Sequence, residues 1–222
     1  MKRRLFLTND GSHSITIDDL HESYHSHNGS IQEGRHNFIK SGADYYKQHF
    51  NPSSITVFEL GFGTGLNALL LYQWYLKNSI SVSYHGLEAF PLEKELWLPL
   101  NYAEQLGLEK QVHEQLHECS WNSKMMLDDR FEFLKTDQKM VDYSFAKTYD
   151  LVFYDAFAPS VQPDLWTYAQ FQKVYNAMNY KGVLVTYSAA GKVRRALSKA
   201  GFWIDEIRGA PGKREMTRAL KL

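Results

Sequence analysis

The sequence predicts an α/β fold built on a doubly wound, mostly parallel sheet. From residue 55 onward, strand-like and helix-like segments alternate, and a glycine-rich turn, GFGTG at 61–65, joins the first strand to the first helix. Such alternation favours parallel pairing with right-handed crossovers. The 222 residues, 44% of them hydrophobic, suffice to bury the core of one domain.

The first 50 residues differ from the rest of the chain. They are polar and rich in histidine, carry turn signals at 9–11 and 28–29, and show no sustained periodicity. We therefore expect an N-terminal extension over 1–50, packed on a main domain over 51–222.

Hydrophobic patterning and helix-ending residues divide the main domain into elements. The expected strands are 55–60, 81–88, 131–135, 149–155, 183–188, 202–207 and 214–222, and the expected helices are 66–78, 92–106, 163–179 and 192–201. Pro99 should break the second helix, and Pro163 suits the first turn of the third. Lys181-Gly182 is expected to end the third helix and Gly201 the fourth.

Composition excludes several classes of protein. Twenty-five basic and twenty-five acidic residues cancel, so an anionic partner requires a local basic patch. Cys119 is the single cysteine, which fits a reducing compartment. The N-terminal apolar run is too short for a signal peptide, and no stretch approaches the roughly 20 apolar residues of a membrane span. We expect a cytoplasmic protein that does not enter a membrane.

The glycines at 61, 63 and 65 predict a ligand site at the carboxyl edge of the first strand. A strand that ends in GxGxG and opens a helix lets backbone approach a ligand. The spacing departs from the dinucleotide fingerprint, because Gly65 comes one residue early, and no P-loop lysine follows. Glu59 suits a ligand with positive charge. The run resembles the first motif of class I S-adenosylmethionine methyltransferases; glycines needed only for a tight turn are the alternative.

Acidic residues end the next strands. Glu88 falls where a doubly wound fold places a carboxylate against ribose hydroxyls, although a surface glutamate would look the same. Asp137 is expected to contact adenine, as in this class of methyltransferase, or to cap a helix. After the fourth strand, DAFAP places Asp155, Phe157 and Pro159 where a methyl acceptor would enter. The chain lacks the [DNS]-P-P-[YF] tetrapeptide of DNA amino-methylating enzymes.

Several motifs together resemble one family, the methyltransferase half of the bifunctional tRNA 5-methylaminomethyl-2-thiouridine biosynthesis proteins. The likeness covers most of 20–218 and is carried by GFGTGLN at 61–67, LEAFPL at 87–92, DAFAPSVQPDLWT at 155–167, VLVTYSAAGKVRRALSKAGF at 183–202 and GKREM at 212–216. It implies a Rossmann-like class I methyltransferase fold with an antiparallel last strand, S-adenosyl-L-methionine as cofactor, and Asn67 among the cofactor contacts. Those proteins continue into an FAD-dependent oxidase domain. We expect a stand-alone methyltransferase that depends on another enzyme for its aminomethyl substrate.

The resemblance implies methylation of the amine of 5-aminomethyl(2-thio)uridine at the wobble position of tRNA. A protonated amine has no lone pair, so Asp155 is expected to orient the amine and accept its proton; the alternative is that Asp155 mainly touches the cofactor. Phe157 is expected to stack on the uracil, Pro159 to fix the loop, and Trp166 to join the substrate site.

A local excess of basic residues marks the C-terminal part. Phosphate contacts require such a patch, although a solvated helix face is the plain alternative. The candidates for RNA contact are Lys192, Arg194, Arg195, Lys213 and Arg214.

Histidines elsewhere are not expected to bind a metal. HEQLH at 113–117 matches the zinc-protease pattern, but its flanks are polar and no third ligand follows. The irregularly spaced histidines at 13, 21, 25, 27 and 36 are interpreted as surface residues. The segment 24–38 is a candidate cover for the cofactor or substrate opening.

The sequence thus predicts a tRNA-modifying N-methyltransferase that can act as a monomer. Two alternatives stay open: a methyltransferase of the same fold for a small-molecule amine, and a cofactor-binding regulatory protein without catalysis. RNA dependence of activity separates the first alternative, and cofactor binding without methyl transfer would favour the second.

Overall fold

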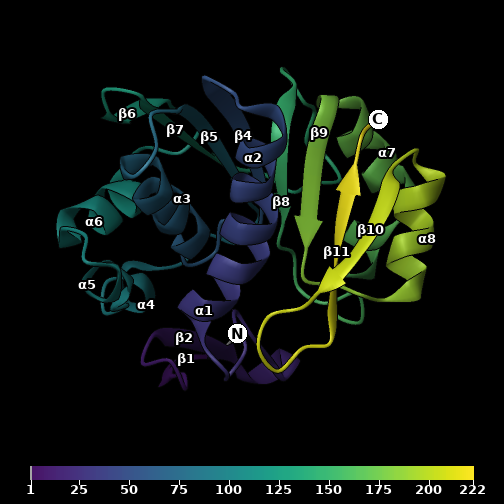
Figure 1. Cartoon of the computed structure of the whole chain (residues 1–222). Coiled ribbons are helices and arrows are strands. Elements are labelled where there is room, and N and C mark those ends of the chain that lie inside the picture. Colours follow the sequence, from purple (N-terminus) through teal and green to yellow (C-terminus); the bar gives the residue numbers. More distant parts are fainter. Residues whose placement is uncertain (1) are drawn as a thin grey trace.

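A computed structural model describes residues 2–222, and its centre is an eight-stranded sheet (Figure 1). The strands lie in the order β10 (Trp203–Arg208), β11 (Glu215–Leu220), β9 (Met178–Thr186), β8 (Tyr149–Tyr154), β4 (Ser54–Leu60), β5 (Ser81–Glu88), β7 (Phe131–Asp137) and β6 (Met125–Asp128). The five central strands pair in parallel, whereas β11 is antiparallel to both of its neighbours and β6 to β7. The predicted Rossmann-like fold with an antiparallel last strand is confirmed.

Helices cover both faces of this sheet. They are α1 (Ser30–Gly34), the π-helical η2 (Arg35–Asp44), α2 (Tyr45–Phe50), α3 (Leu66–Leu76), α4 (Lys94–Trp97), α5 (Tyr102–Leu106), α6 (Lys110–Glu118), the 3-10 turn η3 (Pro163–Trp166), α7 (Tyr168–Asn176) and α8 (Gly191–Lys199). Adjacent strand residues point to opposite faces. Accordingly, Val57 joins the apolar cluster under η2 and α3, and Phe58 joins the cluster under α7 and α8.

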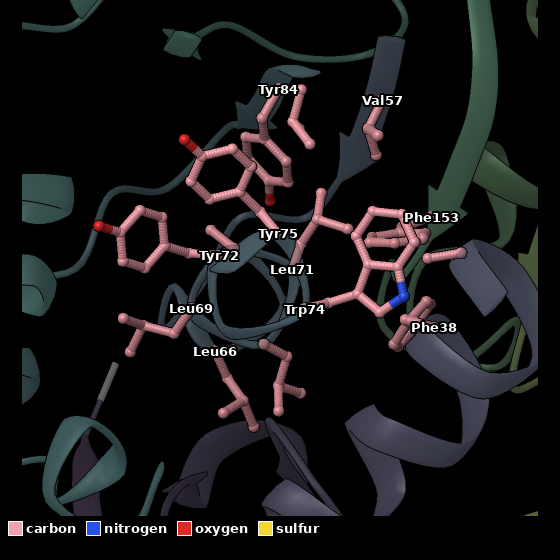
Figure 2. Close-up of a cluster of buried hydrophobic side chains, with 14 of the residues drawn as sticks. Phe38, Val57, Leu66, Leu69, Leu71, Tyr72, Trp74, Tyr75, Tyr84 and Phe153 are labelled. Atoms are coloured by element: carbon pink, nitrogen blue, oxygen red, sulfur yellow. The ribbon is translucent and has the colours of Figure 1, made fainter. Parts of the chain in front are cut away.

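Helix α3 is buried on almost every side. Figure 2 shows Leu66, Leu69, Leu71 and Trp74 radiating from it toward different neighbours. A helix that is apolar all round belongs in a protein interior, and here the sheet, η2, α5 and α6 surround it. This packing anchors the helix whose first residue follows the glycine turn.

The N-terminal residues form a second, three-stranded sheet of β1 (Arg3–Leu7), β2 (His13–Ile17) and β3 (Glu22–Ser23), with a 3-10 turn η1 (Asp18–Leu20). Its short strands were not predicted, because they give too few residues for a periodic signal. The side chain of Asn101 holds this sheet in place, accepting from the His13 backbone N–H and donating to the Gly11 carbonyl at 2.8 and 2.9 Å.

The predicted end of the third helix was wrong. Helix α7 ends at Asn176, and Lys181-Gly182 lies inside β9. Lys181 has a φ of 66° and its N–H donates to the Lys221 carbonyl, next to an irregularity in the β8–β9 register. The Lys-Gly pair therefore marks a kink in a strand, whose local conformation resembles that of a helix end.

Candidate active site

A cavity of about 710 Å³ opens at the carboxyl edge of the parallel strands. This edge is where open α/β sheets bind ligands, and the volume lies within the range of about 300–1,000 Å³ typical of small-molecule sites. The loops after β4, β5, β7 and β8 form one side of the cavity, and residues from the N-terminal segment 17–38 form the other. The segment 24–38, the candidate cover for the opening, contributes residues to this lining, and its covering role stays a prediction.

The three glycines of the turn adopt positive φ angles of 90°, 49° and 73°. A Cβ atom at Gly61 would lie 2.5 Å from the Asp155 carbonyl oxygen, and one at Gly63 would lie 3.0 Å from the Tyr24 ring. Glycine is therefore required because the protein's own backbone and side chains pack against the turn. Gly61, Gly63 and Thr64 also line the cavity.

Two histidines of α6 support the glycine turn through hydrogen bonds to its backbone. The Nε2 atoms of His113 and His117 both lie within hydrogen-bond distance of the Thr64 carbonyl, at 3.2 and 3.0 Å. Burial lowers the pKa of both imidazoles, His117 most strongly, so both rings are neutral and donate through Nε2–H. A Cβ at Gly65 would meet His117 Nε2 at 2.9 Å. The HEQLH motif thus supports the glycine turn, and residues 2–222 contain no cluster of three or more ligating side chains suited to a metal.

Asn67, at the start of α3, connects two carboxyl groups. Its Nδ2 donates to Glu59 Oε1 at 2.7 Å and to Asp155 Oδ2 at 2.8 Å. Glu59 is 1% exposed, does not line the cavity, and also accepts from the Tyr84 hydroxyl. Burial, followed by the nearby Asp155, raises the pKa of Glu59 well above its usual value. Glu59 therefore orients Asn67 from below the site.

Asp155 is in the cavity wall directly after β8. Burial raises the pKa of its carboxyl from 3.8 to about 7, while the hydrogen bond from Asn67 acts in the opposite direction. A group that titrates near neutral pH can accept and release protons under ordinary conditions. Asp155 thus presents to the cavity a carboxyl group that titrates near neutral pH.

Glu88 ends β5 and also lines the cavity. Its carboxylate accepts from the backbone N–H groups of Gly63 and Phe90, both at 2.8 Å. A carboxylate has about four lone-pair positions, so two such bonds leave capacity for hydroxyl groups of a ligand. Burial raises the pKa of Glu88 from 4.5.

Two amide side chains have buried atoms without protein partners. Asn37 lines the cavity, is 1% exposed, and has neither its Nδ2 nor its Oδ1 paired; Asn67 Oδ1 is also unpaired. Buried polar groups are normally satisfied. Both amides therefore fit a polar ligand such as a nucleoside or an amino acid, which supplies the missing donors and acceptors.

The loop after β8 brings aromatic groups to the cavity. Phe157 lines the cavity and meets Tyr24 edge-to-face, with 5.2 Å between ring centroids. Trp166 is buried outside the lining and donates from Nε1 to the Phe157 carbonyl at 2.8 Å. The Pro159 carbonyl accepts from Lys192 Nζ at 3.3 Å. Trp166 and Pro159 thus support the loop, whereas Phe157 is the member that faces a ligand.

Asp137 is exposed and lies outside the cavity lining, while the next residue, Gln138, is part of it. Gln138 donates its backbone N–H to the Glu88 carbonyl at 3.0 Å. The structure therefore brings Glu88, Asn67 and Asp155 together around one cavity but leaves Asp137 beyond its rim.

The basic candidates separate into three environments. Arg194 is 13% exposed at its side chain and pairs with Glu206 and Glu215 at 2.8 and 3.0 Å. Lys213 pairs with Glu33 inside the cavity lining. Exposed side chains are found at Lys192, Arg195 and Arg214.

Several cavity residues were not identified from the sequence. These are Tyr187 and, as individual residues within the expected covering segment 24–38, Tyr24, His25, Glu33 and Asn37. The interpretation of His25 as a surface residue is wrong: it lines the cavity, and burial lowers its pKa to about 4. The N-terminal segment has no motif of its own, so its approach to the site depends on tertiary packing.

Residues 101–222 match a family model described as S-adenosyl-L-methionine-dependent methyltransferase. The tRNA 5-methylaminomethyl-2-thiouridine biosynthesis bifunctional protein MnmC of Vibrio campbellii is 30% identical over 90% of this chain, which spans only 32% of that relative.

Solved structures agree with this match. The crystal structure of MNMC2 from Aquifex aeolicus superposes with a TM-score of 0.79 at 26% identity, covering 98% of this chain and 70% of the other. A SAM-bound amino pentose methyltransferase, CalS10 from Micromonospora echinaspora, gives a TM-score of 0.54 at 11% identity, covering 87% and 92% of the two chains, a likeness of fold alone.

Proposed function

Because the chain belongs to the family of S-adenosyl-L-methionine-dependent methyltransferases, we propose that it methylates the amine of 5-aminomethyl(2-thio)uridine at the wobble position of tRNA. The product is the corresponding 5-methylaminomethyl uridine. One observation carries the proposal: Asp155, with a pKa of about 7, faces a cavity of the right size beside Asn67 and Phe157. The names of the bifunctional relatives support the choice of tRNA.

The residues of the cavity can hold the cofactor, S-adenosyl-L-methionine, which supplies a methyl group on a positively charged sulfur. Glu88 is assigned to the ribose hydroxyls, and the unpaired amide atoms of Asn37 and Asn67 are assigned to polar groups of the cofactor. The turn at 61–65 provides backbone beside the N-terminus of α3. Contact of Asp137 with adenine stays a prediction. The neighbouring Gln138 is better placed for such a contact, because it lines the cavity and Asp137 does not.

Asp155 is assigned to the substrate amine. Its carboxylate accepts a hydrogen bond from the ammonium group, removes one proton from it and thereby leaves a lone pair directed into the cavity. Asn67 fixes the carboxylate by donating to Oδ2. Phe157 and Tyr24 provide aromatic surfaces on which an extruded uracil can stack.

Methyl transfer with labelled cofactor tests this function. Purified protein should label tRNA that lacks the wobble methyl group and should not label tRNA that already carries it. Equal labelling of the two RNA pools, or labelling only of small amines in the absence of RNA, would contradict the proposal.

A further inference from the structure

A second hollow, a groove of about 310 Å³, lies beside the cavity. One wall comes from η2 and the other from the turn between β10 and β11, which Figure 1 shows at the same end of the sheet as α1. The lining residues are His36, Lys40, Arg208, Gly209, Ala210, Pro211, Gly212 and Lys213. The lining contains basic side chains and no acidic one, and we call it the basic groove.

The basic groove adjoins the cavity. Lys213 lines both hollows and pairs with Glu33 on the cavity side. If one nucleotide of an RNA strand enters the cavity, the backbone next to that nucleotide would therefore lie along the basic groove.

A hydrogen bond and close packing hold the walls of the groove in place, and, in the described part of the chain, two of its basic side chains are not paired with acidic groups. His36 Nε2 lies 2.8 Å from the Arg208 carbonyl, which joins η2 to the turn. A Cβ at Gly212 would meet the Asn28 side chain, so the turn packs closely on the N-terminal segment. Within residues 2–222, Lys40 and Arg208 are exposed and make no ion pair, whereas Arg194 is neutralised by two glutamates.

We propose that the basic groove binds backbone phosphates of the RNA strand next to the nucleotide that enters the cavity, through Lys40 and Arg208. The proposal rests on the proposed function. Phosphates attract such cations largely through the release of condensed counterions, and small residues such as those at 209–212 allow a polymer backbone to approach closely. Charge complementarity and the lining residue that the groove shares with the cavity, Lys213, favour this groove over the partly neutralised face of α8.

The test measures binding of undermodified tRNA to the full chain over a range of salt concentrations. The variant Lys40→Glu/Arg208→Glu should bind about tenfold more weakly at low salt, and the slope of log K against log salt should decrease by about 1.5. The matched control is Lys77→Glu/Lys181→Glu. It makes the same charge change at two exposed positions, one shortly before β5 and one in the first half of β9, at the end of the parallel strands away from the cavity. Cofactor affinity and the rate at saturating tRNA should stay unchanged in both.

The outcomes separate the two proposals. Equal affinity and equal salt slope for the groove variant and the control would overturn the basic groove while leaving the function intact. If the unsubstituted protein binds no tRNA at low salt, both proposals are wrong. A groove variant that loses cofactor binding would also overturn the assignment, because the groove would then serve the cofactor site.

Discussion

At the residue scale, the protonation of Asp155 is set by its surroundings. The carboxyl group is buried, accepts from Asn67, and shares that amide with Glu59, whose pKa is also raised by burial. Two carboxyl groups joined by one amide do not ionise equally well in a low-dielectric site. Burial raises the pKa of both carboxyl groups, and Asp155 is the one of the two that lines the cavity and can meet a ligand.

Asp155→Asn should lower the rate of methyl transfer by about 10²- to 10⁴-fold, the usual contribution of a general base. Cofactor affinity should change no more than a few-fold, because Asn retains the shape of the side chain. For the unsubstituted protein, kcat/KM should rise with pH up to about 7, since the carboxylate must be ionised. In the variant this rise should disappear.

Asp164→Asn is the matched control, because Asp164 also lines the cavity but is exposed. It should leave the pH profile intact. Joint loss of cofactor binding and transfer in Asp155→Asn would instead place Asp155 in the cofactor site.

His117→Ala should weaken cofactor binding by about two- to tenfold, the equivalent of one lost hydrogen bond to the Thr64 carbonyl. His117→Gln keeps an N–H donor at similar reach and should restore most of the affinity. Isothermal titration with S-adenosyl-L-methionine provides the measurement. Unchanged affinity in His117→Ala would show that the glycine turn does not depend on α6.

At the scale of elements, the structure explains why the strand-to-helix turn needs glycine. Sequence patterning was sufficient to place β4, the turn and α3, since a strand, a glycine run and an apolar helix each leave a local signal. The carbonyl oxygen that leaves no room for a Cβ atom at Gly61 belongs to Asp155, which follows β8 and is about 90 residues away in the chain. No local pattern contains such a contact.

Gly61→Ala should destabilise the protein more than Gly107→Ala. Both glycines have positive φ, 90° and 67°, but a Cβ at Gly61 would meet the Asp155 carbonyl, whereas nothing lies within 4 Å of a Cβ at Gly107. The left-handed conformation costs about 1–2 kcal/mol in either case, and the overlap adds to it only at Gly61. Denaturant unfolding gives both values, and equal losses would exclude the close contact.

At the scale of the whole molecule, distant segments meet at one edge of the sheet. The strand ends supply Glu88 and Asp155, and their places could be predicted because the carboxyl ends of parallel strands share an edge. The sequence suggests that 24–38 covers the cofactor or substrate opening, but no local signal singles out Tyr24 or Asn37 within it, since the segment reaches the cavity only through tertiary packing. The division of the chain into an extension over 1–50 and a main domain over 51–222 stays a proposal. The helical residues 30–50 pack directly on β8 and β9 of the main domain.

No helix within residues 2–222 is long and apolar enough to cross a membrane. The proposed function depends on which molecule enters the cavity at the carboxyl edge of the sheet, and in particular on whether that molecule is a wobble uridine.

Nucleoside mass spectrometry tests this most directly. The purified protein is incubated with methyl-labelled S-adenosyl-L-methionine and tRNA from cells that lack the wobble methylaminomethyl modification, and the RNA is then digested. We expect labelled 5-methylaminomethyl uridines, and none with Asp155→Asn. RNA that carries no label, from protein that demonstrably binds the cofactor, would contradict the proposed function.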